Sequence, residues 1–178
     1  MLIFVLLIQS RTQALLIDQF VRMLEDGLSF EQVMSKLEPL MASARIFFTV
    51  GSLDYLKMGG RIGKVATAAT GKLGVKPVII MKDGDIGLGG IGRNRNKLKA
   101  SVLQAAKKYL DENGKDNFIV SVGYGYDKEE GFQFMNEVES TLDVKLDSET
   151  NVAIGIVSAV HTGPYPIGLG VIRKYETL

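Results

Sequence analysis

The sequence predicts an α/β fold with α+β character, in which helices flank a mixed, partly antiparallel sheet. Apolar runs of strand length alternate along the chain with segments in which apolar residues recur at helical spacing. Two consecutive strand-like segments are separated only by Asp83-Gly84, a sequence typical of a two-residue hairpin turn. Because this hairpin interrupts the alternation, we expect a mixed sheet rather than a purely parallel one.

The composition is that of a globular protein and excludes several kinds of site. The 178 residues suit one domain, or one domain with a short appendage, and 46% of them are hydrophobic. The formal net charge of +1 offers no argument for nucleic-acid binding. The absence of Cys excludes disulfides, thiolate metal sites and Cys nucleophiles, and a single His excludes a His-rich metal site. We therefore expect no metal centre.

The N-terminal segment is predicted as a strand followed by a helix. Leu2 to Ile8 is an unbroken apolar run, too short to span a bilayer and without the flanks of a signal peptide, so we interpret it as a buried strand. Ser10 can cap a helix that continues to about Glu25. Four apolar residues recur along this helix at helical spacing and are interpreted as core: Ala14, Ile17, Val21 and Leu24.

The next elements carry clear boundary signals. Ser29 and Gln32 have the spacing of a capping box and open a second helix. Residues 45–50, RIFFTV, are rich in β-favouring side chains and are predicted as a strand. Ser52 then caps a short helix, LDYLKM, which ends at Gly59.

The remaining elements follow the same patterns. The residues from Ile62 to Gly74 are rich in Gly and Ala and are predicted as a helix. The hairpin joins Val75–Lys82 to Ile86–Ile91. Further helices are predicted over Asn94–Glu112 and Asp127–Thr141, and further strands over Phe118–Gly123, Val152–Val160 and Leu169–Arg173. The helix over Asp127–Thr141 is expected to have one apolar side, formed by Phe132, Met135, Val138 and Leu142.

Gly59-Gly60-Arg61 is the first candidate for a binding role. Two Gly after a short helix allow a sharp turn that exposes backbone N–H groups, and Arg61 presents a planar charged group suited to a carboxylate or phosphate. A helix C-cap followed by a surface Arg explains the same residues, and composition alone favours this structural interpretation. Arg93 and Arg95, at the start of a helix, can face a partner, although solvated surface is the more frequent outcome.

His161, the only His in the chain, is the second candidate. It follows a predicted strand and precedes Thr162-Gly163-Pro164, a loop of the kind that often carries functional residues. Its imidazole can donate a hydrogen bond to a carboxylate, although a lone His is more often structural. The Gly-rich run from Gly87 to Gly92 has neither P-loop nor Rossmann spacing, and no Ser forms a recognisable nucleophilic site with His161.

Four features of the sequence together resemble a known family. They are YLKMGGRIG, VKPVIIMKDGDI, Arg93 and AVHTGPYPIGLGV, whose order and spacing are similar to the C-terminal half of DegV-family proteins. That family comprises bacterial lipid-binding proteins, the fatty acid-binding subunits of fatty acid kinase. The resemblance covers about Ile8 to Leu178. Two departures are Gln9, where the family usually has Asp, and Tyr165-Pro166, where the His loop of the family usually ends in Gly.

The resemblance implies a division of the chain and a function. Residues 1–43 would be a remnant of the family's N-terminal domain with connecting helices, and residues 44–178 the C-terminal lipid-binding domain, so the chain would be truncated. A long-chain fatty acid would be held with its acyl chain buried and its carboxylate at the domain rim, and presented to a separate fatty acid kinase. The chain itself would be no enzyme and would need no cofactor. It would be cytoplasmic, with no transmembrane segment and with transient contact with a membrane surface.

The resemblance also implies roles for single residues. His161 would hold the carboxylate, with Thr162, Gly163 and Arg61 in the ligand site. Arg61 and Arg93 would face the kinase. The small residues from Gly63 to Gly74 would leave room for the acyl chain, although close helix–sheet packing explains them equally well.

Two other functions remain open at this point. One is a truncated scaffold without a ligand of its own, which folds only with another chain. The other is an enzyme that uses Gly-rich loops and arginines to act on a phosphorylated small molecule. The sequence favours fatty-acid binding over the enzyme, because no general base stands beside those arginines.

Overall fold

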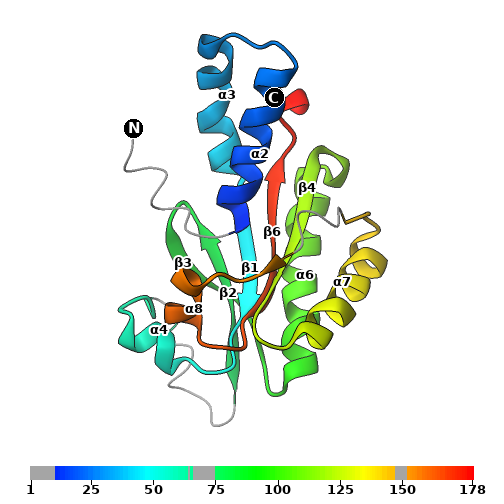
Figure 1. The fold of residues 1–178 in the computed structure, drawn as a ribbon. Helices are drawn as coiled ribbons and strands as arrows, with labels where there is room; N and C mark the ends of the chain where they lie inside the picture. The colour runs from blue at the N-terminus through cyan, green and yellow to red at the C-terminus, as the bar shows by residue number, and fades with distance from the viewer. Residues whose placement is uncertain (1–10, 64, 66–74, 147–151) are drawn as a thin grey trace.

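The computed structural model describes residues 11–63, 65, 75–146 and 152–178, which form a sheet with helices on both faces (Figure 1). The strand predicted at Leu2–Ile8 and most of the small-residue helix predicted from Ile62 to Gly74 lie outside the described residues. Of the helices described, none combines the length and the apolar character needed to cross a membrane. In chain order the elements are α2 (Arg11–Glu25), α3 (Phe30–Ser43), β1 (Arg45–Thr49), α4 (Asp54–Met58), β2 (Lys76–Lys82), β3 (Asp85–Gly92), α6 (Arg95–Asn113), η1 (Lys115–Asn117), β4 (Phe118–Tyr124), α7 (Lys128–Leu142), β5 (Val152–Ala153), α8 (Ile156–Thr162), β6 (Ile167–Arg173) and η2 (Tyr175–Thr177).

The described strands form one mixed sheet in the order β3-β2-β1-β6-β4-β5. Neighbouring strands are antiparallel except β4 and β5, which are parallel and pair only at Gly123 with Val152 and at Tyr124 with Ala153. β6 lies inside the sheet, between β1 and β4. The mixed, partly antiparallel sheet predicted from the sequence is therefore confirmed.

Local signals in the sequence set several of the boundaries. β2 and β3 are joined by Asp83 and Gly84, whose φ angles of 52° and 82° are both left-handed, as the tight hairpin turn requires. Ser29 and Gln32 form the predicted capping box at the start of α3, where each side chain accepts the backbone N–H of the other residue. Gly59 ends α4 as predicted.

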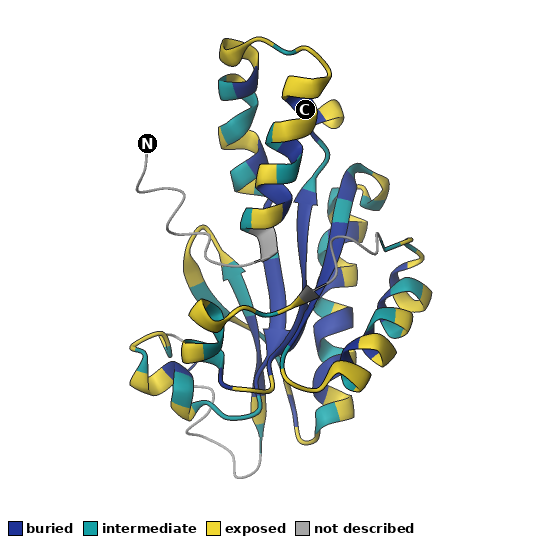
Figure 2. Cartoon of the chain, viewed as in Figure 1, coloured by how far each residue is buried: buried dark blue, intermediate teal, exposed yellow. Residues whose placement is uncertain are grey.

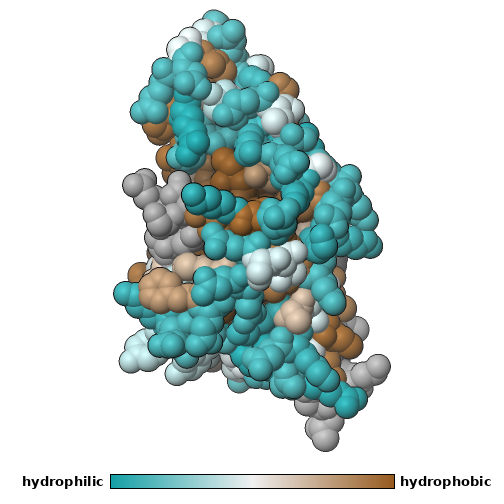
Figure 3. Space-filling model, turned by 90° about the vertical axis from the view of Figure 1, so that its right-hand side faces the viewer, coloured by the Kyte–Doolittle hydropathy of each residue, from teal (hydrophilic) through white to brown (hydrophobic). Residues whose placement is uncertain are grey.

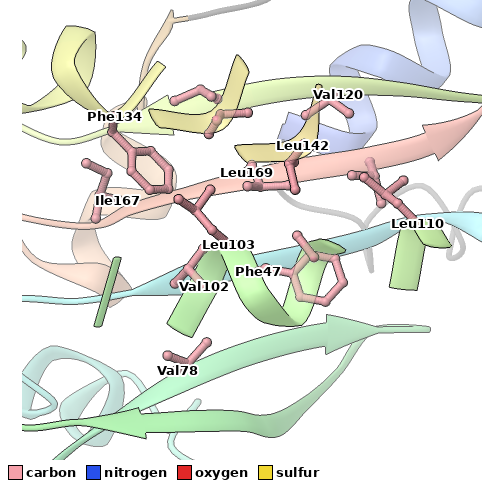
Figure 4. Packing of buried hydrophobic residues seen from close by; sticks show 14 of the residues in the cluster. Phe47, Val78, Val102, Leu103, Leu110, Val120, Phe134, Leu142, Ile167 and Leu169 are labelled. Carbon is pink, nitrogen blue, oxygen red and sulfur yellow. The ribbon is translucent and has the colours of Figure 1, made fainter. Parts of the chain in front are cut away.

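One face of the sheet is covered by α6 and α7, with a continuous hydrophobic core between the two layers. Figure 4 shows Leu103 of α6 and Phe134 of α7 together with Ile167 and Leu169 of β6 in this core. Figure 2 shows the helix sides that face the sheet as buried and the opposite sides as exposed. The same core contains Phe47, Val78, Leu98, Val102, Ala106, Leu110, Phe118, Val120, Val122, Tyr124, Val138, Leu142 and Val171. Burial of so much apolar surface makes this face the main source of stability.

The opposite face of the sheet is built in two separate parts. α2 and α3 pack against one end, where Met23, Val33 and Leu40 are fully buried together with Ile172 of β6. The other end is covered by α4, where the buried cluster consists of Ile46, Phe48, Val50, Leu56, Val65 and Ile79. The two groups of helices lie at the top and the bottom of the sheet in Figure 1. On the side drawn in Figure 3, hydrophobic atoms reach the surface at the height where the α2–α3 hairpin meets the sheet.

The buried side of α2 differs from the prediction. Leu15, Leu16 and Met23 are buried, with Gln19 between them. The residues that the spacing placed in the core are all exposed, namely Ala14, Ile17, Val21 and Leu24. The prediction was wrong because α2 has apolar residues on two sides, and spacing alone does not say which side packs within the chain.

The buried side of α7 was predicted with one error. Val138 and Leu142 are buried as expected, and Gly131 and Phe134 complete that side. Phe132 is 51% exposed and therefore does not belong to it. Phe132 and Phe134 are two positions apart, so they point to different sides of the helix. The predicted spacing selected Phe132, whereas Phe134 faces the core.

The predicted strand from Val152 to Val160 is replaced by a short strand and a helix. Only Val152 and Ala153 pair with β4, and Ile156–Thr162 forms α8. The Gly155 carbonyl accepts the N–H groups of Ser158 and Ala159, which starts the helix. The β-branched side chains suggested a buried strand, but those of α8 are mostly exposed, so no sheet packing selects the extended form.

Candidate functional site

The candidate site is formed where α8 packs against α4, at one end of the sheet. His161 lies in the last turn of α8, and Gly59 and Gly60 follow α4 directly. None of the seven residues of α8 is buried. The site therefore lies at the surface, close to the cluster that α4 forms with the sheet.

The imidazole of His161 lies directly on Gly59. A Cβ atom added to Gly59 would overlap Nδ1 of His161 and would lie 3.1 Å from its Cε1. The φ angle of Gly59 is −76°, so the backbone there does not itself require Gly. Gly59 is required instead because the ring comes so close to it. This is a second role for Gly59, in addition to ending α4.

The Nδ1 atom of His161 is buried and makes no hydrogen bond with any described residue. Buried polar atoms in folded proteins almost always have a partner, so an unpaired ring nitrogen calls for an explanation. An imidazole nitrogen can donate or accept a hydrogen bond, depending on where the proton lies. A partner for Nδ1 would therefore have to come from outside the described residues.

Gly163 ends α8 and fits against an aromatic ring. Its φ angle is +74°, and its N–H donates to the Ala159 carbonyl at 2.8 Å. A Cβ atom at this position would lie 2.5 Å from Cδ2 and 2.7 Å from Cε2 of Tyr55. Both the backbone conformation and the packing therefore require Gly, and the Tyr55 ring ties the His loop to α4.

The rest of the His loop is held by the end of β4. Gly125 and Tyr126 donate their N–H groups to the carbonyls of Pro166 and Pro164, at 2.8 and 2.7 Å. The Tyr165 ring meets Tyr126 edge-on, with 6.4 Å between ring centroids. Tyr165, which departs from the pattern of the resembling family, is thus an exposed part of the His loop that packs on Tyr126.

The hydroxyl of Thr162 and the guanidinium of Arg61 both have partners inside the chain. Thr162 Oγ1 donates to the Ser158 carbonyl at 3.0 Å, a bond within α8. Arg61 is exposed, and its NH1 donates to the Gly59 carbonyl at 2.7 Å. Arg61 therefore lies next to the glycine under His161, and its hydrogen bond in the described part of the chain goes to that glycine rather than to the imidazole.

The two other arginines considered in the sequence lie elsewhere. Arg93 is exposed and precedes Asn94, the N-cap of α6, on the face of the sheet opposite α4. Arg95 forms a two-pronged ion pair with Glu130 of α7, with both nitrogen–oxygen distances 2.7 Å. Arg95 is therefore a structural residue that links α6 to α7.

Two contributors to the site were missed in the sequence. Tyr55 belongs to the motif YLKMGGRIG, but nothing in that motif indicates contact with a residue as distant along the chain as Gly163. Gly125 was missed too, although a Gly between two Tyr just after a strand is a signal for close backbone approach. A Cβ atom on Gly125 would overlap the Pro164 carbonyl oxygen. Among the described residues, no three His, Asp or Glu side chains are grouped as a metal site would require.

Small residues lie between the two clusters on the face that α4 shares with α2 and α3. Ile167, Leu169 and Val171 of β6 point into the core under α6 and α7, so Gly168 and Gly170 lie on the other face. Their partners on β4 are Gly123 and Ser121. This group, the small-residue patch, is buried and places little side-chain volume on that face. Close strand packing also requires Gly168, since a Cβ atom there would lie 2.5 Å from Cβ of Phe48.

Comparison with known proteins identifies the family. The family model described as uncharacterised protein, DegV family, matches residues 7–174. A DegV domain-containing protein of Clostridium acetobutylicum is 28% identical over 166 residues, which make up 93% of this chain and 58% of that protein. This chain thus spans little more than half the length of that relative.

Two solved structures share the fold. A stearic acid-binding protein from Eubacterium ventriosum is 95% identical, with a TM-score of 0.91, over 94% of this chain and 57% of that one. A fatty acid-binding DegV family protein from Thermus thermophilus is 28% identical, with a TM-score of 0.81, over 91% of this chain and 57% of that one. The family match and these two neighbours agree with the resemblance seen in the sequence, and the chain belongs to the DegV family.

Proposed function

We propose that this chain binds a long-chain fatty acid, with the carboxylate beside His161. The ligand class is supported by two related proteins, one described as binding stearic acid and one as binding fatty acids. The observation that carries the proposal is the buried Nδ1 atom of His161, which has no hydrogen-bond partner among the described residues. A carboxylate oxygen becomes that partner when Nδ1 carries the proton, and a charge-assisted bond of this kind is stronger than a neutral one.

The neighbours of His161 have distinct roles in the proposed site. Arg61 adds positive charge at the rim and retains further N–H donors beyond the one used on the Gly59 carbonyl. Thr162 and Gly163 shape the site rather than donate to the ligand, because the Thr162 hydroxyl and the Gly163 N–H already donate within α8. Tyr165 flanks the carboxylate at the rim.

The acyl chain lies on the face of the sheet that is built in two parts. The small-residue patch of Ser121, Gly123, Gly168 and Gly170 brings the backbone within reach there, with an apolar cluster on either side. Burying ~15 methylene groups at about 0.8 kcal/mol each gives roughly 12 kcal/mol before the costs of binding. No cofactor is needed, because the fatty acid itself is the ligand.

The bound fatty acid is presented to a separate kinase, which phosphorylates the carboxylate. In this proposal the chain is a binding subunit and no enzyme. Arg61, exposed beside the site, and Arg93, exposed just before the N-cap of α6, face that kinase. Exposed arginines suit an interface with an acidic surface or with the phosphates of a nucleotide.

We place the protein in the cytoplasm, where it makes transient contact with a membrane surface. The supporting feature is the outer side of α8, where Ile156, Val157 and Val160 are exposed next to the site. Lys57 and Arg61 lie close by on and after α4 and would favour an anionic surface. Exposed apolar side chains beside basic ones are typical of contact with a lipid headgroup region.

A scaffold without its own ligand is the second candidate. The observation in its favour is length, since the chain spans 57% of the stearic acid-binding relative. On this alternative the chain binds fatty acid only when the rest of such a protein is present.

The test uses this 178-residue chain and the complete Eubacterium ventriosum protein side by side. Organic extracts of both are analysed by mass spectrometry, and both are titrated with stearic acid by calorimetry. Fatty acid in both supports the proposal. Fatty acid in the complete protein alone supports the scaffold, and fatty acid in neither overturns both.

His161→Ala tests the head-group assignment. Loss of a hydrogen bond to a charged group, worth about 1.5–3 kcal/mol, is expected to weaken stearic acid binding roughly 10- to 100-fold. Lys108→Ala, exposed on α6, is the matched control and leaves the affinity unchanged. An unchanged dissociation constant for His161→Ala would remove this residue from the site.

A further inference from the structure

The helix α2 is apolar on two opposite sides. Leu15, Leu16 and Met23 form the buried side, which packs against α3 and β6. On the other side lies the outer stripe, consisting of Ile17, Val21 and Leu24, which are 56%, 46% and 50% exposed. These three residues are spaced by four and three positions, so they share one side of the helix.

The orientation of α2 is fixed, so the outer stripe cannot simply turn inward. Gln19, which is 1% exposed, accepts the backbone N–H of Tyr175 at 2.8 Å from the buried side. The Tyr175 hydroxyl donates to the Asp26 carboxylate just after the helix. Asp18 and Arg22 form an ion pair along α2, at 2.9 Å. Rotation of the helix would break the first two bonds and bury these charges.

A helix that is apolar on both sides belongs between two layers of protein. The first layer is the sheet with α3, and nothing among the described residues forms the second. We infer that the outer stripe is the contact surface for the part of a longer DegV-family protein that lies outside this chain. The Eubacterium ventriosum protein is 95% identical over its match and extends beyond it, since that match covers only 57% of its length. This inference concerns how the halves are joined and does not depend on fatty-acid binding.

A second copy of the chain is the less favoured occupant. A stable dimer interface buries roughly 800 Å² on each partner, and three half-exposed aliphatic side chains are well short of that area. A contact within one polypeptide needs less area, because the covalent connection supplies a high effective concentration. The size of the outer stripe therefore suits contact between two parts of one protein.

Thiol labelling tests the inference, since the chain contains no Cys. Val21→Cys is introduced into this chain and at the aligned position of the complete Eubacterium ventriosum protein, and the labelling rate at that peptide is followed by mass spectrometry. We expect rapid labelling in this chain and labelling slower by at least about tenfold in the complete protein, where the site must open before it reacts. Lys108→Cys, exposed on α6 at the other face of the sheet, is the control and should label at equal rates in both.

Equal rates for Val21→Cys in the two proteins would overturn the inference. Slow labelling in this chain that speeds up on dilution would overturn it in favour of a second copy. Circular dichroism of both variants checks that the helices remain folded, which an exposed Val→Cys substitution is expected to leave unchanged.

Discussion

The two faces of the sheet differ in how they are covered. Beneath α6 and α7 a single core runs without interruption from Val78 to Leu142. On the other face, the cluster under α2 and α3 is separate from that under α4, and Gly168 and Gly170 of β6 lie between them. The first face accounts for stability, and the second combines a site at one end with small residues in the middle. Changes on the first face should therefore alter folding, and changes on the second should alter binding.

Phe134→Ala is expected to have the largest effect. Phe134 is fully buried in the continuous core, and truncating such a ring typically costs about 3–5 kcal/mol of unfolding free energy. Urea unfolding measures the loss, and Phe132→Ala is a matched control on the same helix. Phe132 is exposed, with the Lys128 ammonium over its ring and the Tyr124 ring tilted against it, so its loss should cost less than about 1 kcal/mol. Similar costs for the two variants would contradict the contrast between the faces.

Gly59→Ala should weaken binding while leaving most of the stability. The added methyl group would overlap Nδ1 of His161, so the ring and the end of α8 must move away. We expect stearic acid affinity to fall by roughly tenfold, as for the loss of one well-placed hydrogen bond. Gly155→Ala, at the N-cap of α8, is the control, since a Cβ atom there meets nothing within 4 Å. Equal affinity in both variants would show that the seating of His161 on Gly59 is unimportant.

Tyr175→Phe should produce the smallest change, present up to about pH 10 and shrinking as the pH rises further. The hydrogen bond from the Tyr175 hydroxyl to Asp26 raises the pKa of Tyr175 from 10.0 to about 12. The folded chain thus keeps this proton after the unfolded chain has lost it. The stabilisation is present below pH 10 and is lost as the pH rises from 10 to about 12. Between pH 8 and pH 11, the urea midpoint should fall more for the original chain than for Tyr175→Phe. An equal fall would show that this hydrogen bond does not stabilise the α2–α3 cluster.

The fold was predictable where a local signal fixes the backbone. Asp83-Gly84 identified the hairpin, and Ser29 with Gln32 identified the start of α3, because both depend on residues next to one another in the chain. The outer stripe of α2 and the helix α8 were assigned wrongly for a different reason. Their apolar residues are exposed in this chain. A run of apolar residues usually indicates burial in a core, so both segments were predicted to be buried.

The sequence singled out residues of the candidate site but not the contacts between them. His161 and Gly163 stood out because of the rarity of His and the Gly-Pro loop that follows it. The seating of the imidazole on Gly59 and of Gly163 on Tyr55 depends on how two short helices meet in space. No property of either segment alone fixes that meeting, since α4 and α8 lie far apart along the chain.

The position of β6 has a consequence for synthesis on the ribosome. It is the last strand along the described chain, yet it pairs with β1 and β4 inside the sheet. Until Ile167–Arg173 leaves the exit tunnel, β1 and β4 each have an edge whose backbone N–H and C=O groups lack the pairing that β6 provides. The sheet therefore cannot be completed, and its two unpaired strand edges stay open to aggregation, until β6 has been synthesised.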